Sequence, residues 1–551
     1  MDYKKLANLL FPMELKTAEY YENLYPKRDL PKGAIVTRFA PSPTGFLHFG
    51  GVSTSFVANR IAKQSGGKYI LRIEDTDQQR LVEGGIEYII KGLQDFDIVF
   101  DEMVGKGSYG PYVQSERKPI YMAFAKKLVE EGKAYPCFCS AEKLASDREQ
   151  QERNKELLGY YGAYAHCRNL TYDEIEANVK AGKPYAIRLK VDSSPNNKIL
   201  VHDAVRGDLR LSDNYNDVVV LKSDFLPPYN FAHAVDDHLM RMTLVIRGDE
   251  YLPSIAEHLQ IFDALGFERL PYAHIAPIQK IDENGNKRKI SKRKDPEAAI
   301  SFYAEEGYPA ESVKEYILTV ANSNFELWRA QNPVAKVTDF KVSFDKMSVS
   351  GALFDFAKLN DVSKTVISKM KAQDIYKSLL TWAEEYDVKF ANLLEEYKDY
   401  SVQMLNIERE QKKPRKDIAK WNDVKTINSY FYDELFMPKT KEDYEFDYNN
   451  FDYETVKTVL NEYLKTYYVK DDKSTWFDKI KAIAPKVNYA DDMKAYKENP
   501  ENYKGHYGDI ATIIRVALTT KTQTPDLYEI CRLLNKTRMQ VRVKLALEIL
   551  K

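Results

Sequence analysis

The sequence predicts an α/β fold in which a parallel sheet is split by an inserted domain and followed by an all-α C-terminal region. Three observations support this prediction. A strand, a loop, a helix and a second strand follow one another within about 40 residues. Buried-strand character returns after a long mixed segment, at 217–221 (DVVVL) and 243–246 (TLVI). After residue 370 the chain contains only two glycines, Gly505 and Gly508, which favours helices.

The first strand is the apolar run 33–39 (GAIVTRF), which follows a charged, helical extension over residues 1–33. Small and apolar residues at helical spacing then predict a helix over 52–64, and the glycines at 66–67 end it. The next run, 68–73 (KYILRI), is a second short strand. Strand, helix and strand in this order form the βαβ unit of a Rossmann-like parallel sheet.

The pattern in the rest of the chain predicts how it is divided into segments. Helical spacing recurs in the last third, for example over 471–484 and 525–550, and we find no internal repeat. We therefore predict six segments: an N-terminal extension (1–33), the first half of the sheet domain (34–117), an inserted domain (118–215), the second half of the sheet domain (216–300), a connecting region (301–370) and a helical region (371–551).

Composition sets limits on compartment and partners. The 551 residues include 81 Lys and Arg against 82 Asp and Glu, so any contact with an anionic partner must use local basic patches. Four cysteines are too few for a disulfide scaffold, which indicates a reducing compartment. No apolar run reaches signal-peptide or membrane-span length, so we expect a cytoplasmic protein without membrane contact.

One glycine-rich motif is misleading. Residues 105–110 (GKGSYG) match the dinucleotide-binding pattern G-x-G-x-x-G. That pattern needs a strand before it and a helix after it, whereas the preceding DEMV is a poor strand end and Pro111-Tyr112 follows. We interpret the segment as a loop and do not expect a NAD enzyme.

A histidine precedes two glycines where the predicted helix begins. His48, Gly50 and Gly51 would bring an imidazole and unpaired backbone N–H groups to one place, an arrangement suited to a triphosphate. The alternative is a tight strand-to-helix turn in which the glycines only permit close packing.

A basic run lies far downstream, at 287–295 (KRKISKRKD), with six basic residues in nine. Such runs are often solvated surface. Here the order Lys289-Ile290-Ser291-Lys292-Arg293 matters, because together with the segment around His48 it resembles the KMSKR and HIGH signatures of class I aminoacyl-tRNA synthetases.

Further segments resemble glutamyl-tRNA synthetase of the bacterial type, in that family's own order. They cover most of the chain: RFAPSPTGFLHFGG (38–51), GGKYILRIEDTD (66–77), GPYVQSER (110–117), KSD (222–224), VDDHLM (235–240) and the C-terminal stretch 514–547.

The resemblance implies a two-step reaction. Glutamate attacks the α-phosphorus of ATP to give glutamyl-adenylate, and the 3′-terminal ribose of tRNA(Glu) then takes the glutamyl group, with tRNA needed for activation. Catalysis by positioning and charge neutralisation suits such a displacement, and Mg²⁺ should accompany ATP. The implied catalytic residues are His48 and Lys292, and the implied ATP-binding residues are Gly50, Gly51, Glu250, Lys289, Ser291, Lys292 and Arg293.

The resemblance also implies an L-glutamate pocket, lined by Arg38, Ser42, Glu74, Tyr229, Arg247 and, less closely matched, His233. The chemistry fits, because two guanidinium groups match two carboxylates and Glu74 matches the ammonium group. Glutamine would leave one arginine without its counter-charge, a difference of about 3 to 5 kcal/mol. We prefer Arg247 for the side-chain carboxylate and Arg38 for the α-carboxylate, although the sequence does not separate them.

Two positions depart from the usual family pattern. Val52-Ser53-Thr54 replaces a stretch that commonly contains arginine, and His233 stands where asparagine is common. His233 could contact the substrate or pack in the core, and both interpretations stay open.

Three cysteines lie in the inserted domain, where some relatives carry zinc. Cys137, Cys139 and Cys167 could bind zinc with a fourth ligand, for which His166 and Tyr161 are candidates because Asn169 replaces the usual histidine. The alternative is a set of reduced cysteines left from such a site. Cys531 has apolar neighbours at helical spacing and is expected in the core.

By resemblance, the inserted domain binds the acceptor end of tRNA, 301–370 contacts the tRNA stem and 371–551 reads the anticodon. Arg415 looks like the family arginine that inspects the third anticodon base, although a solvated helix start is an equally good interpretation. We expect a monomer.

Three other functions remain to be distinguished. Glutaminyl-tRNA synthetase shares the catalytic motifs but has a β-barrel anticodon module, and a tRNA-modifying glutamyl transferase has no anticodon module at all. A non-catalytic RNA-binding protein would have no reason to keep both His48 and Lys292.

Overall fold

The computed structural model describes residues 1–43, 45, 47–77, 81–291 and 293–551. Its contacts divide the chain into two compact units. The α/β unit comprises Met1–Phe302 and Lys314–Asp355, and the helical unit comprises Tyr303–Val313 and Phe356–Lys551. The division therefore passes through the segment 301–370 that we treated as one region.

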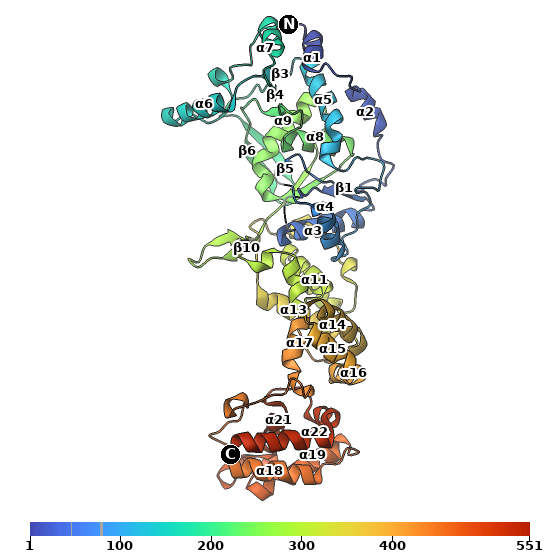
Figure 1. Ribbon diagram of the computed structural model, residues 1–551, viewed down its shortest axis with the longest axis vertical. Helices are drawn as coiled ribbons and strands as arrows, with labels where there is room; N and C mark the ends of the chain where they lie inside the picture. The colour runs from blue at the N-terminus through green and yellow to red at the C-terminus, as the bar shows by residue number, and fades with distance from the viewer. Residues whose placement is uncertain (44, 46, 78–80, 292) are drawn as a thin grey trace. The chain divides into compact units, whose positions relative to one another are not determined.

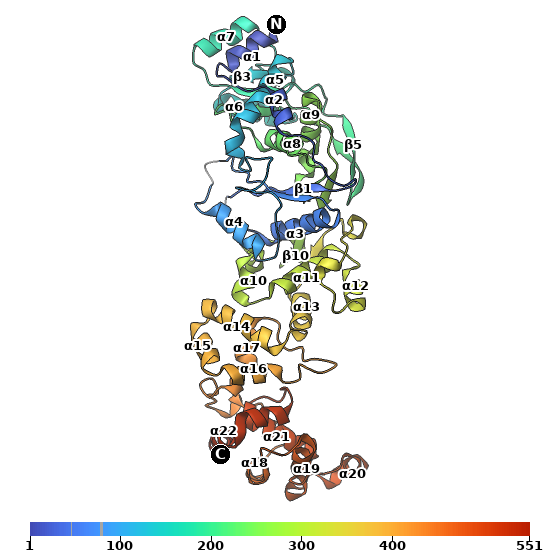
Figure 2. The same cartoon turned by 90° about the vertical axis from the view of Figure 1, so that its right-hand side faces the viewer.

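A βαβ unit forms as predicted near the start of the α/β unit. Strands β1 (Val36–Phe39) and β2 (Lys68–Leu71) pair in parallel with Val36 opposite Lys68, and α3 (Phe49–Gln64) connects them and packs on both (Figures 1 and 2). Gly67 has a steric role before β2, because a Cβ there would lie 1.9 Å from the carbonyl oxygen of Ile35.

A second group of strands extends this layer. β8 (Val245–Gly248) pairs in parallel with β9 (Tyr272–Ile275), and β9 continues to β5 (Lys198–Asp203) and β6 (Gly207–Ser212). The N–H of Thr243, just before β8, donates to the carbonyl of Val36 at 2.9 Å. The carboxyl ends of β1 and β8 therefore lie near each other, where ligands bind in open parallel sheets.

One strand prediction was wrong about its sheet. The run 217–221 forms β7 (Val219–Leu221), but β7 pairs with β4 (Ala186–Leu189) of the inserted domain and β4 pairs with β3 (Ala134–Cys137), all antiparallel. Periodicity alone predicts a buried strand and does not identify its partner.

The remaining elements of the α/β unit are helices and a further three-stranded sheet. The N-terminal extension forms α1 (Tyr3–Leu10) and α2 (Ala18–Leu24), and Leu6, Leu10 and Phe11 are buried in a core shared with α5. The others are α4 (Gly85–Gln94), α5 (Lys118–Glu130), α6 (Ala141–Asn154), α7 (Tyr172–Lys180), α8 (Tyr229–Leu239), α9 (Ile255–Leu265), β10 (Ile278–Ile281), β11 (Lys287–Lys289), α12 (Phe325–Gln331) and β12 (Ala352–Leu353). The three strands of this further sheet lie in the order β11-β10-β12.

Two short helices cross the division between the units, α10 (Ser301–Glu306) and α11 (Ala310–Ala321). The rest of the helical unit contains α13 (Phe356–Ser368), α14 (Ala372–Tyr386), α15 (Val388–Glu396), α16 (Lys398–Asn406), α17 (Trp421–Ile427), α18 (Tyr453–Thr466), α19 (Lys473–Lys481), α20 (Met493–Glu498), α21 (Tyr507–Thr519) and α22 (Leu527–Leu550) (Figure 1). The predicted helices at 471–484 and 525–550 correspond to α19 and α22. Cys531 is fully buried there, as expected.

None of the helices in the described ranges combines the length and apolar character that a membrane crossing requires.

Candidate active site

A cavity of about 370 Å³ opens at the carboxyl ends of β1 and β8. It collects predicted residues from segments that are far apart in the sequence. Of the predicted site residues, those that line it are Arg38, Ser42, His48, Gly50, Gly51, Glu74, Tyr229, Arg247, Glu250 and Lys289. The structure thus brings the two signature segments to one cavity.

His48 is the N-cap residue of α3. Its Nδ1 accepts a hydrogen bond from the N–H of Gly50 at 3.0 Å, so the ring proton of the neutral imidazole is on Nε2. The buried Phe49 anchors the first turn. Because a helix N-terminus also favours anions, the segment combines the positive end of α3 with an imidazole that can donate a hydrogen bond from Nε2.

Part of the basic run reaches the same cavity. Lys289 and Ile290 line it, and the Lys289 Nζ lies 3.1 Å from the Glu250 carboxylate. The run is held by Asp295, which accepts two hydrogen bonds from Arg288, at 2.6 and 2.8 Å, and one from the N–H of Ser291 at 2.8 Å. The Arg288 guanidinium and this backbone N–H hold the pKa of the Asp295 carboxyl well below its usual range.

The remaining members of the run are placed differently. Ser291 is half-buried and Arg293 is exposed, and neither lines the cavity. Lys292, predicted to be catalytic, lies outside the described residues. The expectation that His48 and Lys292 face one cleft therefore stays a prediction, while Lys289 shows that this segment borders the His48 cavity.

Arg38 is buried and already ion-paired. Its Nε lies 3.1 Å from both carboxylate oxygens of Asp237, and its Nη2 lies 3.3 Å from Nδ1 of His233. Asp237 also accepts from Arg72 at 2.5 Å, and Arg72 donates to Glu74 at 3.1 Å. Arg38 and Glu74 line the cavity, and Asp237 and Arg72 behind them complete an alternating array of positive and negative charges.

This array continues below the cavity into residues that the sequence analysis did not assign. Arg117 donates from Nε to Asp236 at 2.6 Å, and the Tyr121 hydroxyl donates to the same carboxylate at 2.8 Å. Arg72, Arg117, Asp236 and Asp237 are fully buried. The only sequence signal is that RIEDTD, QSER and VDDHLM place charges beside apolar runs, which does not reveal the pairing.

His233 does not line the cavity. It is fully buried behind Arg38, with Nδ1 3.0 Å from Asp237, so of the two interpretations the structure favours core packing over direct contact with substrate. Burial lowers its pKa to about 4, so the ring is neutral at pH 7.

Arg247 differs from Arg38 in its partners. It is 5% exposed, and its guanidinium donates to the Tyr229 hydroxyl at 3.1 Å, to Nε2 of His274 at 3.0 Å and to Nδ1 of His258 at 3.3 Å. Burial raises the pKa of Tyr229, which keeps this hydroxyl protonated. Neither His258 nor His274 is predicted from the sequence, because each looks like an ordinary buried residue of a helix or strand.

Comparisons with known proteins agree with this geometry. Residues 34–361 match the family described as tRNA synthetases class I (E and Q), catalytic domain, and residues 418–547 match an anticodon binding domain. A glutamate–tRNA ligase of Clostridium perfringens is 48% identical over 98% of this chain and 100% of its own length.

The chain belongs to the glutamate–tRNA ligase family of class I aminoacyl-tRNA synthetases.

Other family members extend the match. A glutamate–tRNA ligase of Acetivibrio thermocellus is 47% identical over 99% of this chain and all of its own. A crystal structure of a glutamate tRNA ligase from Elizabethkingia meningosepticum, in complex with its amino acid, is 25% identical with a TM-score of 0.75, covering 94% of this chain and 100% of that one. The predicted Rossmann-like domain followed by a helical anticodon-binding region is confirmed.

Outside the cavity, the three cysteines of the inserted domain cluster. Their sulfur atoms lie within 4.8 Å of one another, and the Tyr160 hydroxyl lies 3.4 Å from Cys137 and 3.5 Å from Cys139. A hydrogen bond from Cys167, together with Tyr160 and Arg188, lowers the pKa of Cys137 to about 4. Such a thiolate is the form that binds metal.

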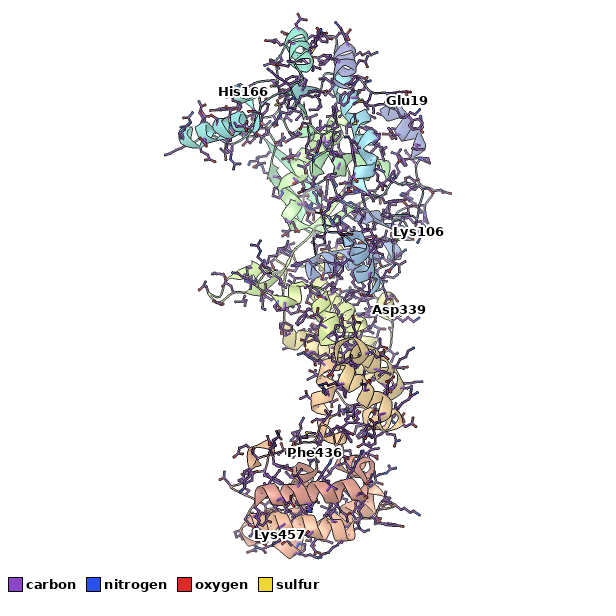
Figure 3. All side chains as sticks on the ribbon, viewed as in Figure 1. Glu19, Lys106, His166, Asp339, Phe436 and Lys457 are labelled. Carbon is purple, nitrogen blue, oxygen red and sulfur yellow. The ribbon has the colours of Figure 1, made fainter. Side chains whose placement is uncertain are left out.

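The two fourth ligands suggested by the sequence lie elsewhere. His166 hydrogen-bonds Asp147 of α6 at 2.9 Å, and Figure 3 shows it beside that helix. The Tyr161 hydroxyl donates to the carbonyl of Leu157. Tyr160 takes the neighbouring position because its hydroxyl accepts from the N–H of Cys167 at 3.0 Å.

Arg415 lies in the helical unit. Its side chain is only 7% exposed and its Nε donates to Asp417 at 2.8 Å. Its two terminal nitrogen atoms are buried without a hydrogen-bond partner in the part of the chain that the structure describes. A role in contacting an anticodon base stays a prediction.

Proposed function

We propose that this protein activates L-glutamate with ATP and transfers it to the 3′-terminal ribose of tRNA(Glu). The observation that carries the proposal is the single cavity that is lined by His48 and Lys289 and also by Arg38 and Arg247. The first pair suits a triphosphate and the second suits an amino acid with two carboxylates.

The ATP end acts by positioning and charge. His48 would donate a hydrogen bond from its Nε2–H to the α-phosphate as charge builds up, while Lys289 and Lys292 neutralise the departing pyrophosphate. No side chain needs to become a nucleophile. Mg²⁺ would arrive with ATP, and the Glu250 carboxylate at the cavity is an oxygen ligand of the kind that Mg²⁺ prefers.

The amino-acid end separates the two charged parts of glutamate. The α-carboxylate and ammonium form a zwitterion, which matches the opposite charges of Arg38 and Glu74 in the cavity lining. The side-chain carboxylate adds one net negative charge, which matches Arg247. Glutamine would leave Arg247 without an anion, so we expect a preference of about 10² to 10³ for glutamate.

We further propose how tRNA is bound. The inserted domain (118–215) would hold the acceptor end, 301–370 would contact the stem, and the helical unit would read the anticodon with Arg415. The family match to an anticodon binding domain over 418–547 supports anticodon reading by the helical unit, and Arg415 lies just before the matched residues. A cytoplasmic monomer is the expected working form.

Zinc is proposed as a structural ion of the inserted domain. Cys137, Cys139 and Cys167 supply three sulfur ligands, and the Tyr160 hydroxyl, which lies beside Cys137 and Cys139, is a candidate fourth donor. Metal analysis of the purified protein tests this: about one zinc per chain is expected, and less than about 0.2 per chain would contradict it.

The decisive experiment is aminoacylation of tRNA(Glu) and tRNA(Gln), each with glutamate and with glutamine. We expect glutamate on tRNA(Glu). Glutamine as the preferred amino acid would favour a glutaminyl enzyme, and binding of tRNA without charging would favour a non-catalytic protein. ATP–pyrophosphate exchange with and without tRNA then tests whether activation needs tRNA.

A further inference from the structure

Arg38 and Arg247 line the same cavity but are held in opposite ways. Arg38 forms an ion pair with Asp237. Among the described residues, no carboxylate forms an ion pair with Arg247, although this side chain is equally buried. A buried cation without a counter-ion is costly, so the groups that hold it there need an explanation.

The first group is His274, which faces Arg247 across the parallel pair β8 and β9. Nδ1 of His274 lies 2.7 Å from the Asp203 carboxylate on β5, and a carboxylate only accepts hydrogen bonds. The ring proton is therefore on Nδ1. Nε2 keeps its lone pair and accepts from Nε of Arg247 at 3.0 Å.

The second group is His258 on α9. Its Nε2 lies 2.8 Å from Oδ1 of Asn230, and the amide nitrogen of Asn230 donates to Glu257. Because the amide nitrogen is engaged with a carboxylate, Oδ1 faces His258 as an acceptor and the ring proton is on Nε2. Nδ1 is left to accept from Nη2 of Arg247 at 3.3 Å.

Two hydrogen-bonded chains thus end on the guanidinium of Arg247. One starts at Asp203 and passes through His274, and the other starts at Glu257 and passes through Asn230 and His258. In each chain the carboxylate fixes the orientation of a neutral imidazole, which then presents a lone pair to Arg247. Burial lowers the pKa of both His258 and His274, and the positive charge of Arg247 acts in the same direction, so both rings stay neutral.

We infer that His258 and His274 are positioning residues that orient Arg247 without neutralising it, so that its charge selects the side-chain carboxylate of glutamate. The inference rests on the proposed function. A carboxylate in either position would hold Arg247 equally well but would satisfy its charge internally. A protonated imidazole could not accept the hydrogen bond and would repel it.

The test uses two substitutions that are nearly identical in shape. His258→Gln offers Arg247 a neutral amide oxygen, and His258→Glu offers a carboxylate in the same place. Aminoacylation of tRNA(Glu) is measured over a range of glutamate, glutamine and ATP concentrations, with thermal unfolding to confirm that both variants fold.

For His258→Glu we expect KM for glutamate to rise by about 100-fold or more, and the preference for glutamate over glutamine to fall by a similar factor. KM for ATP should change little. For His258→Gln we expect only a few-fold rise in KM for glutamate, with the preference for glutamate kept. A merely structural histidine would not distinguish the two replacements.

His274 provides an independent arm. His274→Gln can still link Asp203 to Arg247, whereas His274→Leu cannot. We expect about a tenfold larger KM for glutamate in the leucine variant than in the glutamine variant. Should the Gln and Glu variants at 258 show equal KM values and equal preference, the inference is wrong. Failure of the wild-type protein to charge tRNA(Glu) would instead reject the proposed function.

Discussion

The two units of this protein differ in the kinds of side chain that they bury. Under the cavity, the α/β unit buries four fully enclosed charged side chains, Arg72, Arg117, Asp236 and Asp237, that pair with one another. The core of the helical unit is aliphatic and aromatic, with rings such as Phe431 and Tyr432 at its centre. Its most buried cation, Arg542, is held by the backbone carbonyls of Tyr430 and Leu518 and by the exposed Asp433.

We relate this difference to the function of each unit. Burying charges costs desolvation free energy, and apolar replacements of buried ion pairs are often as stable. On the proposed function, the α/β unit keeps them behind a site that matches a zwitterion and a triphosphate, because a rigid layer of charges does not have to reorganise around each substrate. The helical unit carries no such floor among its described residues and is held by packing.

The largest expected effect is the loss of one buried charge. Asp237→Asn leaves Arg38 and Arg72 without their shared anion and should lower the free energy of unfolding of the α/β unit by about 3 to 5 kcal/mol. Asp433→Asn, the same chemical change at an exposed site of the helical unit, should cost about 1 kcal/mol or less. Urea unfolding, monitored by hydrogen exchange in peptides from each unit, measures both losses in the free energy of unfolding. Equal losses for the two variants would contradict the proposed difference between the units.

Acid should act on the α/β unit first. The folded-state pKa of His233 is about 4, below its unfolded value near 6.5, so its neutral burial contributes fully above pH 6.5. As pH falls from 6.5 towards 4, only the unfolded chain binds the proton, and about 3 kcal/mol is lost. The only histidine of the helical unit, His506, is half-buried.

The pH effect is measured by urea unfolding at pH 7 and pH 4.5. His233→Asn should reduce the loss at the lower pH, because asparagine does not titrate in this range. A variant with an unchanged pH dependence would show that other groups, such as His258, control the effect.

A smaller difference in stability is expected between phenylalanine substitutions at two buried tyrosines, one in each unit. Tyr121 donates to Asp236, so Tyr121→Phe should cost about 2 kcal/mol. The Tyr430 hydroxyl, in the helical unit, is buried without a partner among the described residues, and Tyr430→Phe should be neutral or slightly stabilising. Thermal unfolding of the two variants provides the comparison, and a larger loss for Tyr430→Phe would reverse it.

The smallest stability change is expected at Arg415. Arg415→Gln removes the Nε hydrogen bond to Asp417 and also two buried nitrogen atoms that lack described partners. Because these two effects oppose each other, the free energy of unfolding should change by less than about 0.5 kcal/mol. If Arg415 reads the anticodon, charging of tRNA(Gln) relative to tRNA(Glu) should nevertheless rise. Unchanged tRNA selectivity would exclude Arg415 from base recognition.

Local patterns predicted the parts of the fold and site that depend on adjacent residues. The βαβ unit and the turn at His48 follow from apolar runs, glycines and a capping residue within a short stretch. The family resemblance predicted that Arg38, Glu74 and Arg247 line one pocket, and all three line the same cavity. Their roles are left to experiment.

The remaining parts depend on partners that no local pattern specifies. β7 was assigned to the wrong sheet because a buried strand looks the same in either. The choice of Tyr160 over His166 near the cysteines depends on a loop hydrogen bond to Cys167. His258 and His274 were missed because their contact with Arg247 joins α9, β9 and β8.

The hydrogen bond from Gly50 to His48 has a consequence for the conditions under which the protein can work. A group that donates Nε2–H while electrically neutral does not need acid to be effective. We therefore expect the adenylation step to persist in mildly alkaline solution, where an imidazolium-dependent mechanism would already have slowed.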